Sequence, residues 1–181
     1  MTIETKPLAL TVNGRPVGPV DVPEGLMMQD FLHEYLNLTG SRMGCGQGIC
    51  HACTVIVENE DGALREMRTC ITGAHWFAGK KIVTIEGHAD HDAKGELVGL
   101  SPVQQAFIEH FAFQCGYCTP GFVTGATVLL DQLKRKPVAR AELEQVVTDA
   151  LDKHICRCTG YVRYHIAVRD LILATPGLVS G

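Results

Sequence analysis

The spacing of apolar residues changes along this chain, from short runs near its beginning to a helical period in its second half. Residues 8–12 and 15–22 are two apolar-rich runs separated by Asn13 and Gly14. An Asn-Gly pair favours the type I′ turn of a two-residue hairpin, so the two runs are predicted to pair as strands. Prolines interrupt the second run, which predicts that it lies at an edge of the sheet.

A helix and three further strands are predicted before residue 86. Apolar residues recur at helical spacing over residues 26–36, with Tyr35 expected on the inward face and Gln29 on the outward face. Further strands are expected at residues 54–57, 63–67 and 82–85. A hairpin, a helix and further strands around a loop rich in cysteine form a β-grasp, ferredoxin-like arrangement.

The second half of the chain is predicted to be helical. Ser101 is placed as an N-cap, Pro102 as the first helical residue and Gln104 as the partner in a capping box. Three more helices are expected, near residues 119–136, 140–154 and 160–174. The chain is therefore predicted to be α+β, with one domain at residues 1–85, a linker without apolar period at 86–100 and a four-helix domain at 101–181.

Composition excludes several classes of protein. Hydrophobic residues make up 46% of the 181 residues, and a net charge of −4 gives no reason to expect nucleic-acid binding. No apolar run is long enough to span a membrane, and the first twenty residues lack the layout of a signal peptide. There is also no dinucleotide motif, phosphate-binding loop or nucleophile elbow. We expect a chain that is not catalytic alone and is cytoplasmic by default, where thiols stay reduced.

Three cysteines share one loop, and a fourth follows at a distance. Their C-x4-C-x2-C spacing with a later cysteine is the plant-type ligand pattern for a [2Fe-2S] cluster, and the residues are Cys45, Cys50, Cys53 and Cys70. Glycines alternate with these ligands, and their freedom at positive φ lets backbone N–H groups point at sulfur. Structural zinc sites usually offer two separate cysteine pairs, so zinc fits this loop poorly.

The other four cysteines form a second set, made of two close pairs from distant parts of the chain: Cys115, Cys118, Cys156 and Cys158. A C-x2-C pair with a C-x-C pair is also typical of zinc sites, so the residues alone leave iron and zinc about equal. No cysteine is left over. The eight thiols therefore divide into two groups of four.

The motifs around these cysteines resemble those of the iron–sulfur subunits of the xanthine dehydrogenase family of molybdenum hydroxylases. They are the plant-type loop, Cys-Gly-Tyr-Cys-Thr-Pro-Gly at residues 115–121 and Cys-Arg-Cys-Thr-Gly-Tyr at 156–161. The resemblance covers about residues 8–173. It implies a β-grasp plant-type ferredoxin domain, then a four-helix domain, each with one [2Fe-2S] cluster. His51 stands where the family usually has glycine.

The resemblance also implies a function. This chain would relay electrons from a molybdopterin cofactor, bound by a large partner subunit that oxidises an aldehyde, an N-heterocycle or a similar small molecule. The electrons would pass on to a flavin subunit, a haem protein such as a cytochrome c subunit, or another acceptor. Gln114 and Cys158 are implied to lie against the molybdopterin. A partner subunit can also carry such a complex to the periplasm or to a membrane.

Two alternatives remain at this stage: a freestanding ferredoxin-like electron carrier and a zinc-stapled interaction module. The histidines have simpler interpretations. His51 is expected to be a polar neighbour that tunes the first cluster, and His88 and His91 to lie on a solvated surface. The remaining histidines with no partner pattern are expected to be structural, namely His75, His110, His154 and His165.

Overall fold

The computed structural model describes residues 4–180. The predicted ends of the two domains, at residues 1 and 181, therefore lie outside the described residues. A tight hairpin begins the fold. Strands β1 (Thr5–Val12) and β2 (Arg15–Pro23) pair antiparallel. Asn13 and Gly14 join them with φ values of 51° and 76°. Both values lie in the left-handed region that a type I′ turn requires, so the predicted hairpin is confirmed.

The hairpin is part of a five-stranded sheet. Its order is β2-β1-β5-β3-β4, with β3 at Thr54–Glu58, β4 at Leu64–Arg68 and β5 at Lys81–Val83. Strand β2 lies at one edge, as its prolines predicted, and β1 pairs parallel with β5. One face of the sheet buries an apolar cluster that includes Leu8, Val12, Phe31, Phe77 and Ile82.

The predicted first helix is shorter and more irregular than expected. It consists of α1 (Met28–Asp30) and a π-helical turn at Phe31–Tyr35. Tyr35 was expected inward but is 41% exposed. Gln29 was expected to face solvent but is fully buried, where its side chain donates to the carbonyl oxygen of Ser41 (2.7 Å). Because its amide finds such partners inside the protein, Gln29 can be buried at little cost.

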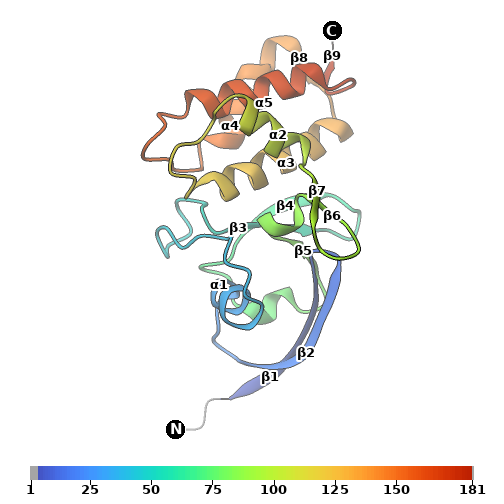
Figure 1. Ribbon diagram of the computed structural model, residues 1–181, viewed down its shortest axis with the longest axis vertical. Helices are drawn as coiled ribbons and strands as arrows, with labels where there is room; N and C mark the ends of the chain where they lie inside the picture. Colours follow the sequence, from blue (N-terminus) through green and yellow to red (C-terminus); the bar gives the residue numbers. More distant parts are fainter. Residues whose placement is uncertain (1–3, 181) are drawn as a thin grey trace.

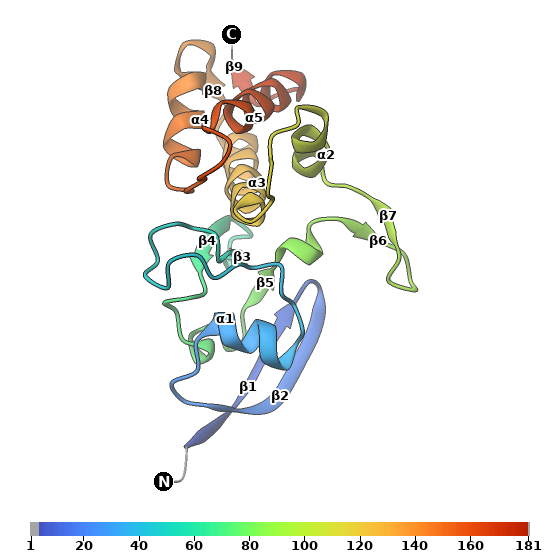
Figure 2. The ribbon, with the colours of Figure 1, turned by 60° about the vertical axis from the view of Figure 1, so that its left-hand side comes forward.

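Short elements connect the sheet to the helices. A 3₁₀ turn covers Ala74–Phe77, a second covers Ile85–Gly87, and a small hairpin pairs β6 (Asp90–His91) with β7 (Leu97–Gly99). This hairpin lies within the segment predicted as a linker and projects to one side of the molecule (Figure 2). It was not predicted, because strands of two and three residues are too short to show a period in the sequence.

The prediction of a solvated surface is wrong for His88. Its Nδ1 lies 3.3 Å from Oγ1 of Thr127 on the longest helix, and its ring is largely covered by protein. Burial disfavours the charged imidazolium and lowers the pKa of His88 to about 4. His91 is exposed, as expected.

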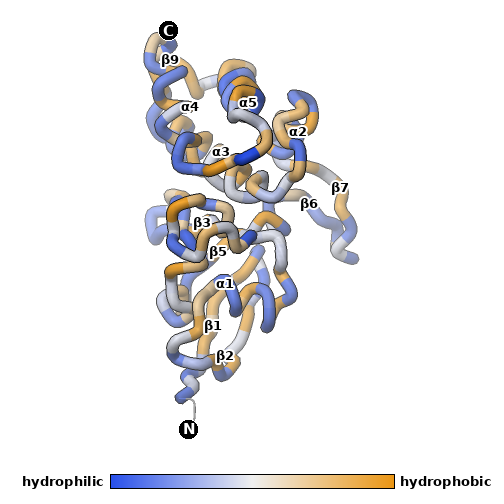
Figure 3. The backbone as a smooth tube through the Cα atoms, turned by 90° about the vertical axis from the view of Figure 1, so that its left-hand side faces the viewer, coloured by the Kyte–Doolittle hydropathy of each residue, from blue (hydrophilic) through white to orange (hydrophobic). Residues whose placement is uncertain are grey.

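Four helices form the second unit, stacked above the sheet along the long axis (Figure 1). Hydrophobic and hydrophilic residues are mixed in the helical part of the chain (Figure 3). The buried apolar residues, Phe107, Phe122, Leu129, Leu151 and Tyr164 among them, form a second core. The helices are α2 (Pro102–Glu109), α3 (Thr119–Arg135), α4 (Leu143–Leu151) and α5 (Val162–Ala174). A 3₁₀ turn at Arg140–Glu142 leads into α4, and a short parallel bridge, not predicted, joins β8 (Val138–Ala139) to β9 (Val179–Ser180).

The start of α2 confirms the predicted capping box. The Ser101 hydroxyl accepts from the backbone N–H of Gln104 (3.3 Å), and the Gln104 side chain accepts from the backbone N–H of Ser101 (2.9 Å). Two N–H groups that the helix itself cannot satisfy are thereby paired. None of the helices in residues 4–180 is long and apolar enough to cross a membrane.

The two units meet where α3 packs on β3 and β4 (Figure 2). Gly121, in the first turn of α3, lies so close to the sheet unit that an added Cβ would be 2.3 Å from the carbonyl oxygen of His51. At the other end of α3, Asp131 accepts from the backbone N–H of Leu64 (3.1 Å). The junction is therefore closely packed along the whole helix.

Candidate metal centres

The first predicted cysteine set surrounds one loop of the sheet unit. Cys45, Cys50 and Cys53 lie in the loop that leads into β3, Cys70 follows β4, and all eight cysteines are free thiols. Gly44 leaves room for sulfur, because a Cβ there would lie 2.8 Å from Sγ of Cys50. A loop that brings thiols together and keeps side chains away from them suits a bound cluster.

Backbone N–H groups of this loop point at Cys45. Those of Gln47, Ile49 and Cys50 lie 3.3, 3.4 and 3.5 Å from its Sγ. Burial raises the pKa of Cys45, but donation from these N–H groups outweighs burial and lowers the pKa to about 6. The thiolate, which is the ligand form, is therefore favoured at neutral pH. The same donors would offset the negative charge of an iron–sulfur cluster.

The second predicted set is assembled from two loops of the helical unit. Sγ of Cys158 lies 3.7 Å from Sγ of Cys115 and 3.9 Å from Sγ of Cys156. Two sulfurs bound to one tetrahedral metal ion at 2.3 Å would be about 3.8 Å apart, so these thiols already have the spacing of metal ligands. Cys118 is buried beside Tyr164, and burial raises the pKa of Cys118 to about 12 in the metal-free thiol.

The structure places Gln114, the other predicted molybdopterin contact, at the edge of the second set, and Arg157 also lies there. Gln114 precedes Cys115 and is exposed, and Arg157 lies exposed between Cys156 and Cys158. Cys115 and Cys158 are themselves exposed, whereas Cys118 and Cys156 are buried. The second set therefore opens to the surface on one side.

Two cysteine loops, the first-set loop at residues 45–53 and the second-set loop of Cys156 and Cys158, touch each other through the backbone. The N–H of Ile155, next to Cys156, donates to the carbonyl oxygen of Cys50 (3.1 Å). One hydrogen bond therefore links Cys50 of the first set to the residue that precedes Cys156 of the second set. The spacing of cysteines within each set gave no information on this contact.

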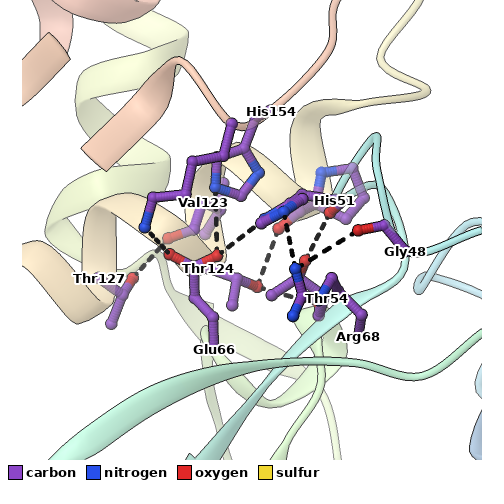
Figure 4. Close-up of polar contacts among 11 residues, drawn as sticks. Gly48, His51, Thr54, Glu66, Arg68, Val123, Thr124, Thr127 and His154 are labelled. Atoms are coloured by element: carbon purple, nitrogen blue, oxygen red, sulfur yellow. Dashed lines mark hydrogen bonds and ion pairs between the residues drawn. The ribbon is translucent and has the colours of Figure 1, made fainter. Parts of the chain in front are cut away.

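A buried polar cluster beside this contact was missed by the sequence reasoning (Figure 4). It contains Glu66 of β4, His51 of the first loop and His154, which follows α4. Nδ1 of His51 and Nε2 of His154 lie 3.3 and 3.4 Å from the same oxygen, Oε2 of Glu66. The one signal for this cluster in the sequence was His51, which stands where the family usually has glycine. In the structure His51 adopts a φ of 57°.

Comparisons with known families agree with two cluster-binding units. A family described as "2Fe-2S iron-sulfur cluster binding domain" matches residues 10–75. A second, described as "[2Fe-2S] binding domain", matches residues 84–169. Together they favour iron over zinc for both cysteine sets.

Individual relatives resemble the chain over nearly its whole length. The nicotine 6-hydroxylase small subunit of Paenarthrobacter nicotinovorans is 37% identical over 93% of this chain and 88% of its own. The xanthine dehydrogenase iron-sulfur-binding subunit of Escherichia coli O157:H7 is 39% identical over 87% of this chain and 89% of its own. The solved structure of quinoline 2-oxidoreductase from Pseudomonas putida 86 superposes with a TM-score of 0.76, at 31% identity, over 92% of this chain and 91% of that chain.

These matches confirm the predicted fold class, a β-grasp ferredoxin-like unit followed by a helical [2Fe-2S] unit, and the predicted cofactors, two [2Fe-2S] clusters. They also favour a subunit of a molybdenum-dependent oxidoreductase over a freestanding carrier or a zinc module, because the relatives that the chain matches along its length are small subunits of such complexes. The chain belongs to the family of iron–sulfur, electron-transfer subunits of the xanthine dehydrogenase-type molybdenum hydroxylases.

Proposed function

We propose that each cysteine set holds one [2Fe-2S] cluster and that the chain passes electrons between a molybdopterin-binding large subunit and a further acceptor. The first cluster would be held by Cys45, Cys50, Cys53 and Cys70, and the second by Cys115, Cys118, Cys156 and Cys158. Such clusters accept and donate electrons singly. The observation that carries this proposal is that the eight free thiols fall into two sets, and that the loop of Cys50 contacts the loop of Cys156 through a backbone hydrogen bond.

We also propose residues 1–85 and 101–181 as the two cluster-binding domains, with residues 86–100 as the segment between them. Each of the two units has its own apolar core in support of this division. The hairpin of β6 and β7 would then be a feature of the connecting segment.

The surface around Cys115 and Cys158 is proposed as the face that meets the large subunit. Both cysteines are exposed, and apolar side chains flank them along the chain, with Phe111 74% and Val162 64% exposed. Exposed apolar patches of this kind mark interaction sites. Gln114, exposed beside Cys115, would contact the molybdopterin together with Cys158, because its amide can both donate and accept hydrogen bonds.

The names of the relatives support a proposal for the substrate, and the loop of the first cysteine set supports one for the acceptor. The names of two relatives, nicotine 6-hydroxylase and quinoline 2-oxidoreductase, refer to N-heterocycles, so a molecule of that class or an aldehyde is proposed as the substrate of the complex. Ile49 and Ile71, both exposed beside the first cysteine set, would face the acceptor, which is proposed to be a flavin or cytochrome c subunit. The complex would be cytoplasmic unless a partner carries it to the periplasm or to a membrane.

Replacing Phe111 with aspartate tests the proposed partner face. A charge in the centre of an apolar interface must be desolvated without a partner, so we expect at least a tenfold loss of molybdenum co-purifying with the tagged chain. The iron content of the chain itself should stay unchanged. Leu97→Asp, which alters an exposed leucine of β7, is the matched control and should retain the partner. Equal molybdenum recovery from both variants and from the unaltered chain would contradict the assignment of this face.

A further inference from the structure

Glu66 joins the two cysteine loops from a position between them. It projects from β4, while His51 lies between two cysteines of the first set and His154 lies two residues before Cys156 (Figure 4). Oε2 of Glu66 lies 3.3 Å from Nδ1 of His51 and 3.4 Å from Nε2 of His154. His154 is 1% exposed, and among residues 4–180 Glu66 is the acidic residue within ion-pair distance of its ring.

The charges around this cluster suit an ionised carboxylate that hydrogen-bonds His51 and lies within ion-pair distance of His154. Burial raises the pKa of Glu66, but His154, His51 and Lys153 outweigh burial and lower the pKa to about 2, so the carboxylate is ionised. Nζ of Lys153 lies 4.0 Å from Oε1. Nη1 of Arg68 lies 3.4 Å from Nε2 of His51, which makes that nitrogen the acceptor and leaves the proton on Nδ1, facing Glu66.

The same positive charges disfavour a metal ion at this site. Two imidazoles and a carboxylate are a common ligand set for zinc. Here, however, Lys153 lies within ion-pair distance of the carboxylate and Arg68 contacts His51, so a divalent cation would add uncompensated charge to a largely buried position. The hydrogen-bonded arrangement therefore fits the surroundings better.

Both imidazoles sit directly beside the backbone contact between the loops. His51 follows Cys50, His154 precedes Ile155, and the N–H of Ile155 donates to the carbonyl oxygen of Cys50 (3.1 Å). The His154 ring packs against Phe122 and against His51, with centroid distances of 5.1 Å each. A movement of either loop would disturb its contact with Glu66, which is a hydrogen bond for His51 and an ion-pair contact for His154.

We propose that Glu66 is a positioning residue that fixes the first cysteine loop against the second through His51 and His154. Glu66 would thereby set the separation and relative orientation of the two clusters that the loops hold. This inference rests on the proposed assignment of the cysteine ligands. Electron transfer between fixed centres needs such a constant geometry, and Glu66 would supply it without touching either set of thiols.

Glu66→Gln in the complete, cluster-loaded protein tests this role. A neutral amide would weaken the hydrogen bond to His51 and remove the charge attraction to His154, so the loops should separate more often. We expect hydrogen exchange of the peptide containing the Ile155 amide to become about tenfold faster. We also expect the magnetic splitting between the two reduced clusters in electron paramagnetic resonance to become weaker or broader. Glu58→Gln, on the neighbouring strand, removes an exposed carboxylate and should change neither readout.

His51→Gly provides a second, independent variant. Glycine adopts φ 57° without strain, so this variant should fold even if Glu66→Gln does not. It removes the hydrogen bond from Glu66 to His51 and leaves the contact with His154, so we expect exchange about threefold faster. In the double variant the effect should not exceed that of Glu66→Gln alone, because both changes remove the same link.

The outcomes separate this inference from the proposal on which it rests. If both cluster signals are present and neither exchange nor splitting changes in the two variants, Glu66 does not position the loops. A stoichiometric non-iron metal that is lost with Glu66→Gln would also overturn the inference, because Glu66 would then be a metal ligand. If the unaltered protein lacks both cluster signals, the ligand assignment itself fails.

Discussion

Replacing Cys158 with serine is expected to remove the second cluster while leaving the first in place. Sγ of Cys158 lies 3.7 Å from Cys115 and 3.9 Å from Cys156, so it is central to the second set. A serine hydroxyl is a far weaker ligand than a thiolate at neutral pH because its proton is held more tightly. We expect the iron content to fall from about four to about two atoms per chain, and one of two paramagnetic signals to disappear after reduction.

Cys45→Ser is the reciprocal control. Cys45 receives three backbone N–H groups in the first loop and belongs to no contact of the second set. It should remove the other signal and leave the one that Cys158→Ser abolishes. The rate at which the large subunit reduces the remaining cluster should fall only in Cys158→Ser, since that cysteine lies on the proposed partner face. Loss of the same signal in both variants, or of neither, would contradict the division into two sets.

Gly121→Ala is expected to disturb the junction between the two units. The added Cβ would lie 2.3 Å from the carbonyl oxygen of His51 and 3.2 Å from Nδ1 of His154. The carbonyl oxygen of His51 belongs to the backbone of the first cysteine loop, so the added methyl group can be accommodated only if that loop moves. Overpacking of this kind costs about 1–3 kcal/mol, and we expect a loss of that size in the free energy of unfolding. Chemical denaturation of the cluster-loaded protein measures it.

A second glycine provides the comparison for this substitution. A Cβ added at Gly25 would meet nothing within 4 Å, and its φ lies outside the left-handed region. Gly25→Ala should therefore change the free energy of unfolding by less than about 0.5 kcal/mol. If Gly121→Ala is as mild as Gly25→Ala, the close approach of α3 to the first loop is not part of the folded protein.

Elements whose signals lie in neighbouring residues were predicted well from the sequence. Asn13 and Gly14 determine their own turn through their backbone preferences. Ser101 and Gln104 satisfy each other within one helical turn. Cysteine spacing predicts two sets of thiols, because three members of the first set share one loop and the second set consists of two close pairs.

Features that depend on distant residues were missed. Gln29 is buried because Ser41 and Thr69, at sequence separations of 12 and 40, hydrogen-bond its side chain. Glu66 lies among ordinary polar residues of a strand, and nothing near it indicates that His51 and His154 converge on it. The strands β8 and β9 are two residues each and pair across the part of the chain that contains α4 and α5. In each case folding brings together partners that no local pattern connects.

Determination of iron, acid-labile sulfide and zinc in the protein purified without oxygen tests the central claim most directly. We expect about four iron and about four sulfide per chain, no stoichiometric zinc, and two distinguishable signals in electron paramagnetic resonance after reduction. A colourless protein that contains zinc in both cysteine sets, and neither iron nor sulfide, would contradict the assignment of two [2Fe-2S] clusters.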